Sequence, residues 1–132
     1  MRVAELMHKD VTTVGLDATV GDAVVALADG HFSAVPVVDT HHRVVGVVST
    51  TDILNALAES SGPDERERVF ETPAREIMTP HAISLSPDAD VLEAARNMLY
   101  LEVHRVFVVE DGRLVGVLSQ TDIVGAVATA KI

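Results

Sequence analysis

The apolar positions of the chain follow two patterns, and each pattern occurs twice. Within residues 20–27 and 91–98, apolar side chains recur every three or four positions, which predicts two amphipathic helices. After each helix come two short apolar runs, AVPVVD with VVGVVS and RVFVVE with LVGVLS. The second pair is separated by Asp111-Gly112, a strong signal for a two-residue hairpin turn. Because the runs are continuously apolar, we expect strands that are buried on both faces.

These patterns belong to one sequence unit that is present twice. VAELM at residues 3–7 aligns with AREIM at residues 74–78, which places Met7 opposite Met78. Beyond the hairpin turn, which is one residue shorter in the second copy, GVVSTTDILNAL from Gly46 aligns with GVLSQTDIVGAV from Gly116. The chain is therefore an internal duplication of one supersecondary unit.

Both copies share the same predicted order of elements. A short turn leads to a brief extended piece, and a helix, a hairpin and a final helix follow. Capping pairs are expected at the first helix of each copy, Thr19 with Asp22 and Asp90 with Glu93. The fold class is thus α/β with two β-α-β-β-α units. The predicted ranges are 4–7 and 75–78 for the turns, 12–14 and 82–85 for the extended pieces, 1–59 and 74–132 for the two units, and 60–73 for a linker with a solvated charged run.

Composition narrows the classes of function. The formal net charge of −10 repels phosphate backbones, so we expect no nucleic-acid partner. There is no cysteine, no apolar run long enough to span a bilayer and no signal-peptide pattern, which predicts a cytoplasmic chain with no membrane partner. The sequence has no Gly-x-Ser-x-Gly motif and no glycine-rich phosphate loop, so we expect no enzyme. Six histidines without metal-ligand spacing predict no metal site.

The repeated Ser-x-x-Asp, at Ser49 and Asp52 and again at Ser119 and Asp122, has two interpretations. It is a capping box in which the serine and the acid satisfy backbone N–H groups at a helix start. It is also a carboxylate at a strand–helix junction, where it can accept both hydroxyls of a ribose while nearby hydroxyls and helix N-terminal amides face a phosphate. Residue chemistry alone favours the cap, and the two roles are compatible.

The order of these motifs resembles a tandem pair of CBS domains, often called a Bateman module. The resemblance rests on Leu6-Met7 and Ile77-Met78, on the Val-Val-acid strand ends, and on the repeated Gly-apolar-apolar-Ser-x-x-Asp. It implies two repeats that pack through their sheets about a pseudo-two-fold axis. It also implies two clefts that bind adenine nucleotides or other adenosyl compounds, and pairing of modules into dimers.

The resemblance assigns roles to particular residues. Asp52 and Asp122 would hold the ribose, and His104-Arg105 would contact phosphate, although a solvated pair is an equal alternative. Copy one has Ser33-Ala34 at that place, so two occupied clefts should bind unequally. The remaining expected ligand residues are polar helpers and base-pocket residues: Ser49, Thr51, Ser119 and Thr121, and Thr12, Val14, Ile83, Leu85, Pro36 and Phe107, of which Phe107 also suits the core.

Taken together, the sequence predicts a regulatory module that senses AMP, ADP, ATP or S-adenosylmethionine. The adenine nucleotide would be a ligand, with Mg²⁺ arriving alongside it, and no catalytic cofactor is expected. Expected partners are a second copy of the chain and an effector protein. The alternative is a ligand-free scaffold that dimerises through the apolar final helices DILNALA and DIVGAVATA.

Overall fold

The computed structural model describes residues 1–80 and 83–132. The chain forms two compact units, and each contains most of one sequence copy. The first-copy unit comprises residues 12–82, and the second-copy unit comprises residues 1–11 together with residues 83–132. The predicted extended piece at 82–85 lies partly outside the described residues.

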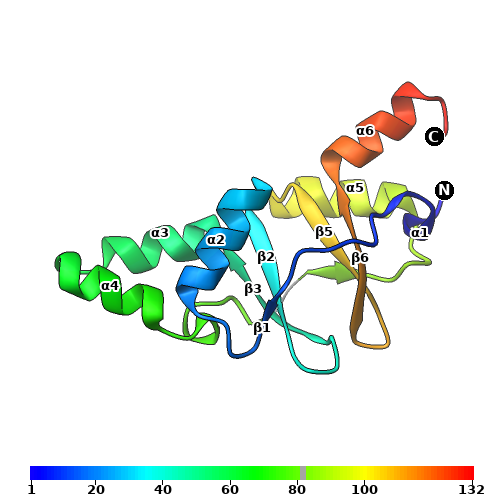
Figure 1. Ribbon diagram of the computed structural model, residues 1–132. Coiled ribbons are helices and arrows are strands. Elements are labelled where there is room, and N and C mark those ends of the chain that lie inside the picture. Colours follow the sequence, from blue (N-terminus) through cyan, green and yellow to red (C-terminus); the bar gives the residue numbers. More distant parts are fainter. Residues whose placement is uncertain (81–82) are drawn as a thin grey trace. The chain divides into compact units, whose positions relative to one another are not determined.

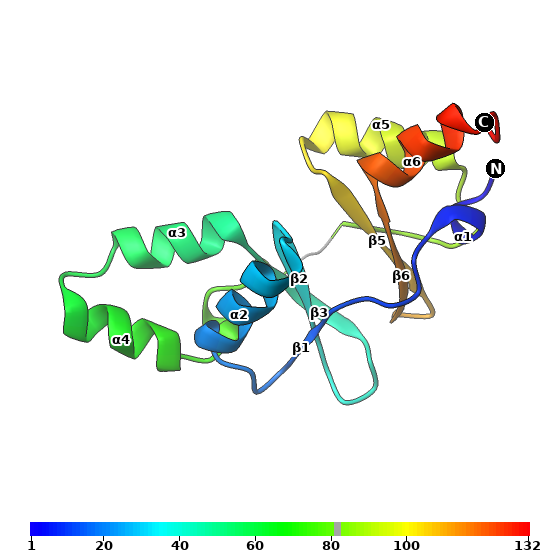
Figure 2. The ribbon, with the colours of Figure 1, turned by 45° about the horizontal axis from the view of Figure 1, so that its top comes forward.

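The first-copy unit is a three-stranded sheet with two helices on one side (Figures 1 and 2). Strand β1 pairs in parallel with β2, and β2 pairs antiparallel with β3. A further helix, α4, packs beside α2 and α3, so the linker is helical at this point. The elements are β1 (Val14–Gly15), α2 (Val20–Gly30), β2 (Ala34–Val38), β3 (Val44–Ser49), α3 (Thr50–Ala58), α4 (Pro63–Glu71) and the 3-10 turn η1 (Ala74–Glu76).

The second-copy unit repeats this arrangement. Its sheet has the order β4-β5-β6, with the same parallel and antiparallel pairings. The predicted β-α-β-β-α order is therefore confirmed in both copies. In the described part of the chain, none of the helices has the length and apolar character needed to cross a membrane. The elements are α1 (Val3–Leu6), β4 (Ser84–Leu85), α5 (Val91–Leu101), β5 (Arg105–Glu110), β6 (Arg113–Ser119) and α6 (Gln120–Ala128).

The leading segment of each copy packs in the unit of the other copy. The Val3 N–H donates to the Ala89 carbonyl at 2.8 Å, and the Ala74 N–H donates to the Ala18 carbonyl at the same distance. Val3 and Ala74 are fully buried, each in the core cluster of the unit in which it lies. Sequence repeats and compact units therefore divide the chain differently, and the boundaries at 59 and 74 stay a prediction about the repeats.

A methionine on a glycine fixes each leading segment against its sheet. A Cβ atom at Gly116 would lie 2.6 Å from the Met7 sulfur, and one at Gly46 would lie 2.5 Å from the Met78 sulfur. The added atoms would also lie 3.0 Å from the His8 carbonyl oxygen at Gly116 and 2.9 Å from the Thr79 carbonyl oxygen at Gly46, so a side chain at either position would force the backbone of the leading segment to shift as well as the methionine. Two separate parts of the repeated sequence, the apolar-Met and the glycine, are thus the two halves of one contact.

Backbone hydrogen bonds extend each sheet at the same place. His8 and Val117 exchange two N–H···O bonds of 2.9 Å. Thr79 and Val47 exchange equivalent bonds of 2.8 and 2.9 Å. Each leading segment thereby covers part of an otherwise unpaired strand edge, on β6 and on β3.

Most local features agree with the sequence patterns. Asp111 and Gly112 both have positive φ, as the two-residue turn requires. Thr19 and Asp22 form a full capping box. The expected box at Asp90 is wrong, because Asp90 caps α5 alone by accepting from the Leu92 N–H at 2.8 Å.

The strands differ from the expectation of burial on both faces. Strand β2 is buried from Val35 to Val38, as predicted. Strands β3 and β6 instead alternate between buried and partly exposed positions. The partly exposed positions inside these strands are occupied by valine rather than by polar residues. The sequence pattern therefore does not show the alternation in burial.

Replacing either contact glycine with alanine is expected to destabilise the fold. Gly116→Ala and Gly46→Ala would each force a methyl group into the methionine side chain, an overpacking that costs about 1–3 kcal/mol. Urea denaturation of the single variants measures the loss. Gly125→Ala is the matched control, because nothing lies within 4 Å of a Cβ in that helical position. It should stabilise the chain by about 0.5–1 kcal/mol, and equal losses at all three positions would refute the contact as the cause.

Candidate functional site

The two repeated aspartates occupy the same local structure. Asp52 Oδ2 accepts from the Ser49 N–H at 2.8 Å, and the Asp52 N–H donates to Ser49 Oγ at 3.1 Å. Asp122 and Ser119 repeat both distances. The capping interpretation is therefore confirmed for both pairs. Since one carboxylate oxygen serves the cap, the second oxygen, Oδ1, remains for other partners.

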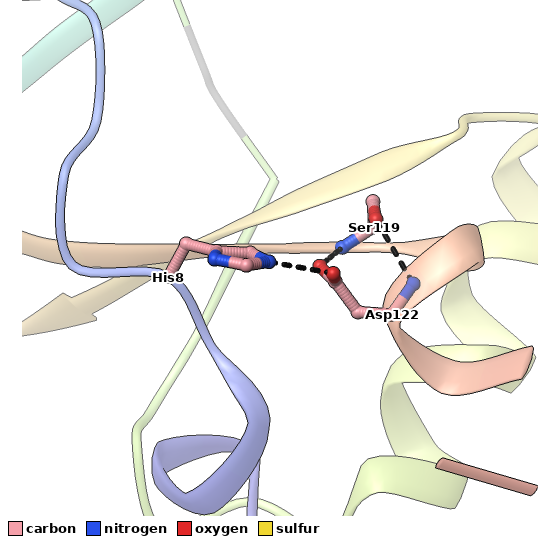
Figure 3. Close-up of polar contacts among 3 residues, drawn as sticks. All are labelled: His8, Ser119 and Asp122. Carbon is pink, nitrogen blue, oxygen red and sulfur yellow. Dashed lines mark hydrogen bonds and ion pairs between the residues drawn. The ribbon is translucent and has the colours of Figure 1, made fainter. Parts of the chain in front are cut away.

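The second oxygen has a different neighbour in each unit. Asp122 Oδ1 lies 2.6 Å from His8 Nε2, and Figure 3 shows the imidazole reaching from the leading segment to the start of α6. Among the residues that the structure describes, Asp52 Oδ1 accepts only a long bond of 3.4 Å, from the Thr79 hydroxyl. His8 and Thr79 are equivalent positions, each next to the methionine that contacts a glycine. The two sites thus share a cap and differ in the side chain facing the carboxylate.

The surroundings of Asp122 keep its carboxylate ionised. The side chain is 15% exposed, and this partial burial raises the pKa. Bonds from the Ser119 backbone, His8 and the Ser119 hydroxyl act in the opposite direction, and the pKa of Asp122 is lowered overall. An ionised carboxylate is purely a hydrogen-bond acceptor, which is the state that can receive ligand hydroxyls.

Several predicted pocket residues fall in one row across each sheet. In the second-copy unit, Phe107 pairs with Val117, which pairs with His8. In the first-copy unit, Pro36 pairs with Val47, which pairs with Thr79. The predicted residues of the short first strands are adjacent to these rows: Val14 pairs with Val37, and Leu85 pairs with Val108.

The structure places the basic pair at the start of β5, beside the start of α6. Arg105 pairs in register with Ser119, the capping residue of α6. His104 Nδ1 lies 3.2 Å from Gln120 Oε1, and the Gln120 N–H donates to the His104 carbonyl. In the first-copy unit the residue in register with Ser49 is Ala34. One unit therefore has an arginine in register with its capping serine where the other has an alanine.

The other predicted residues lie in less constrained positions. Thr51 and Thr121 are exposed on the first turns of α3 and α6. Thr12 and Ile83 are exposed just before β1 and β4. Phe107 and Pro36 are buried, but neither belongs to the core cluster of its unit, which takes the strand residues on either side of each.

A separate apolar groove of about 360 Å³ lies between α2 and α3. Neither Asp52 nor any other predicted ligand residue lines it, so this hollow is distinct from the capping site. Within the described residues, no cluster of three or more His, Asp or Glu side chains could hold a metal ion. The lining residues are Val24, Leu27, Ala28, His31, Phe32, Thr50, Ile53 and Leu54.

Sequence reasoning did not single out His8 or Thr79 as residues beside the two aspartates. The available signal was the alignment of Met7 with Met78, because it also aligns His8 with Thr79. What the alignment lacks is the exchange of leading segments, which brings position 8 to Asp122 rather than to Asp52.

Fold and site together define a duplicated α/β module with a capped carboxylate in each unit. The family model of the CBS domain matches residues 3–59 and 74–129. The chain belongs to the CBS-domain family, as a tandem pair of these domains.

Solved structures of CBS proteins resemble the whole chain. The CBS domain pair of protein MJ0100, in complex with 5′-methylthioadenosine and S-adenosyl-L-methionine, is 26% identical with a TM-score of 0.79, and the match covers 98% of both chains. CBSX2 in complex with AMP is 26% identical with a TM-score of 0.81, covering 99% of this chain and 98% of that one.

Curated relatives are longer proteins. Inosine-5′-monophosphate dehydrogenase of Methanocaldococcus jannaschii is 30% identical over 120 residues, which is 90% of this chain but 22% of that enzyme. The chain spans between 22% and 57% of the length of the first five curated relatives. The similarity to enzymes is thus confined to a part of each.

Removing the Asp122 carboxylate should change how stability depends on pH. Because the folded chain lowers the pKa of Asp122, its contribution is fully present above the ordinary value of 3.8 and is lost as pH falls through the lower folded value. Asp122→Asn should therefore be less stable than the parent at pH 7, with a difference that shrinks in acid below about pH 4. Urea denaturation from pH 3 to pH 7 measures this.

The control for this experiment is Asp10→Asn, which removes an exposed carboxylate from the same unit. It changes the net charge equally but breaks neither the cap nor the pair with His8. The interpretation would be wrong if the stability difference for Asp122→Asn were constant over the whole pH range.

Proposed function

We propose that this chain is a regulatory module that binds an adenosyl ligand, an adenine nucleotide or S-adenosylmethionine, at its two capped carboxylates. Ligand binding favours one arrangement of the module, and an effector protein or a second copy responds to it. The module itself carries out no catalysis. The known complexes of similar CBS pairs with AMP and with S-adenosyl-L-methionine support this class of ligand.

The observation that carries the proposal is the geometry of the carboxylate. In each unit the capping box holds an aspartate at a strand–helix junction with one oxygen committed to the backbone. The other oxygen of Asp52 has only the long Thr79 contact among the described residues. Such an oxygen is a preorganised acceptor for a ribose hydroxyl, and the helix N-terminus beside it favours negatively charged groups of the ligand.

The two sites would hold different parts of the ligand with different strength. Arg105 and His104 stand at the cap of α6, where they would contact a phosphate, and Ala34 and Ser33 take their places at the cap of α3. A phosphorylated ligand such as AMP, ADP or ATP would therefore prefer the second-copy site. Any Mg²⁺ would arrive with the nucleotide phosphates rather than occupy a protein site of its own.

Loss of the carboxylates should weaken adenosyl binding. A hydrogen bond to a charged group contributes about 1.5–3 kcal/mol, so Asp52→Ala and Asp122→Ala should each weaken their own site by roughly tenfold to a hundredfold. The double variant should show that loss of affinity at both sites, and a correspondingly smaller thermal shift, with AMP, ADP, ATP or S-adenosylmethionine. Calorimetry on nucleotide-stripped protein makes the measurement, with and without Mg²⁺.

Asp22→Ala separates the ligand role from the cap. Asp22 accepts from the Thr19 N–H at 2.9 Å in the same type of capping box, so its loss should destabilise the chain to a similar degree. It is not among the proposed ligand residues and should leave affinity unchanged. Equal losses of affinity in Asp22→Ala and in the double variant would remove the ribose assignment.

A second candidate function, a dimerising scaffold, is favoured by apolar side chains on the helices. Leu54 on α3 is 64% exposed, Val124 on α6 is 66% exposed, and Leu99 on α5 is 76% exposed. Side chains of this type at such exposure mark association surfaces when they lie together. A homodimer through these helices is compatible with ligand binding and would give the ligand an assembly to act on.

A charge on the exposed apolar side of α3 should separate the copies. Leu54→Glu places a carboxylate where a second copy would bury an apolar side chain, so we expect a dimer to dissociate to monomer at micromolar concentration. Sedimentation velocity measures the assembly state. Asn55→Glu, on the neighbouring exposed position of α3, adds the same charge to a polar position and should leave a dimer intact. A parent chain that sediments as a monomer would exclude this interface.

A further inference from the structure

We infer that His8 is a proton-dependent competitor for Asp122, so that the second-copy site binds a ribose more weakly in acid while the first-copy site does not. This inference rests on the proposed adenosyl function and adds a residue that makes the two sites unequal. It starts from the close contact between His8 Nε2 and Asp122 Oδ1, which Figure 3 shows.

The two aspartates differ in how their carboxylate oxygens are already bonded. Asp122 Oδ2 receives the Ser119 N–H at 2.8 Å, and Oδ1 receives His8 at 2.6 Å, so both carboxylate oxygens are already bonded. A ribose diol donates two hydrogen bonds and would have to displace the imidazole from Oδ1. At Asp52 the corresponding contact is a hydroxyl at 3.4 Å, which is longer than a good O–H···O bond. That oxygen receives a ribose without displacing a strong donor.

His8 has a backbone held by hydrogen bonds and a side chain that is largely exposed. Its backbone is fixed by two 2.9 Å hydrogen bonds to Val117, while its side chain is 64% exposed. The imidazole can therefore rotate away from Asp122 into solvent without unpairing the leading segment from β6. Thr79 is held to Val47 in the same way, so the two positions present different side chains from equivalent backbones.

Charged residues lie on the elements that pack around the His8 imidazole. Asp122 on α6 is the acidic group in direct contact with it. The other charged residues on the packed elements are Glu5, Lys9 and Asp10 on its own segment, Lys131 just beyond α6, Arg113 at the far end of β6, and Glu93 and Arg96 on α5. Glu5 accepts from the Arg2 N–H at 2.6 Å and so serves the α1 cap.

These charges give the direction of the pH effect. Histidine is the side chain that ordinarily changes charge between pH 5 and pH 8. A protonated imidazole makes a charge-assisted bond to the Asp122 carboxylate, so a ribose hydroxyl competes poorly with it. A neutral imidazole makes a weaker bond to the same oxygen, so ribose binding at Asp122 is stronger when the proton is absent.

The test uses adenosine as the probe, because it carries the ribose and the base but no phosphate that titrates in this range. In Asp52→Ala the second-copy site is the one that keeps its carboxylate. In Asp122→Ala the first-copy site keeps it. Calorimetric titrations at pH 5.5 and pH 8 should show about tenfold tighter binding at the higher pH for Asp52→Ala, and no pH effect for Asp122→Ala.

Reciprocal substitutions then exchange the behaviour of the two sites. His8→Thr in the Asp52→Ala chain should remove the pH effect and tighten binding at pH 5.5 by about tenfold. Thr79→His in the Asp122→Ala chain should create a pH effect where there was none. The far-UV circular dichroism spectrum of each variant confirms that it is folded.

Three outcomes would overturn the inference, and they can be told apart. A pH effect that persists unchanged after His8→Thr removes His8 as its cause. A second outcome is that adenosine binds the parent chain but not Asp52→Ala, and that His8→Thr does not restore the binding. In that case the first-copy site works, and there is no second site at which His8 could compete. Absence of adenosine and AMP binding in the parent and in every variant overturns the proposed function itself, and the competitor with it.

Discussion

The approach of a methionine sulfur to a glycine backbone is the contact on which both units depend. Met7 on Gly116 and Met78 on Gly46 set each leading segment against a strand, and the flanking backbone then pairs with that strand edge. The same segments deliver Val3 and Ala74, both fully buried, to the two cores. Neither repeat completes its core from its own copy, so each core contains residues of both copies.

This contact also decides what faces each aspartate. The residue after each methionine stands in line with the paired strands and reaches the carboxylate at the start of the final helix. Position 8 therefore belongs to the site of Asp122, and position 79 to the site of Asp52. The fold thus places a side chain that differs between the two copies beside each aspartate, where a substitution would change the surroundings of the carboxylate without disturbing the methionine contact.

The sequence predicted what local periodicity and local polar pairs determine. Helices, hairpins, the positive-φ turn at Asp111-Gly112 and the caps at Ser49 and Ser119 all follow from residues within a few positions of one another. The exchange of leading segments did not follow, because VAELM and AREIM have the same apolar spacing and either could complete either sheet. For that reason the sequence located both aspartates but not His8, which is 114 positions from Asp122. Their ribose role depends on a ligand and stays a prediction.

Duplication preserved the carboxylates and changed their surroundings. The two capping boxes have the same hydrogen-bond distances, 2.8 and 3.1 Å in both units. The differences gather beside them: His8 against Thr79, and Arg105 in register with Ser119 against Ala34 in register with Ser49. Both changes bring a basic side chain to the second-copy site, in a chain whose formal net charge is −10. They act in opposite ways, since Arg105 would attract an anionic ligand group while His8 occupies the acceptor that a ribose needs. With the proposed ligand, the second-copy site would therefore be the one at which charge and proton concentration alter binding, and the first-copy site would depend on the carboxylate alone.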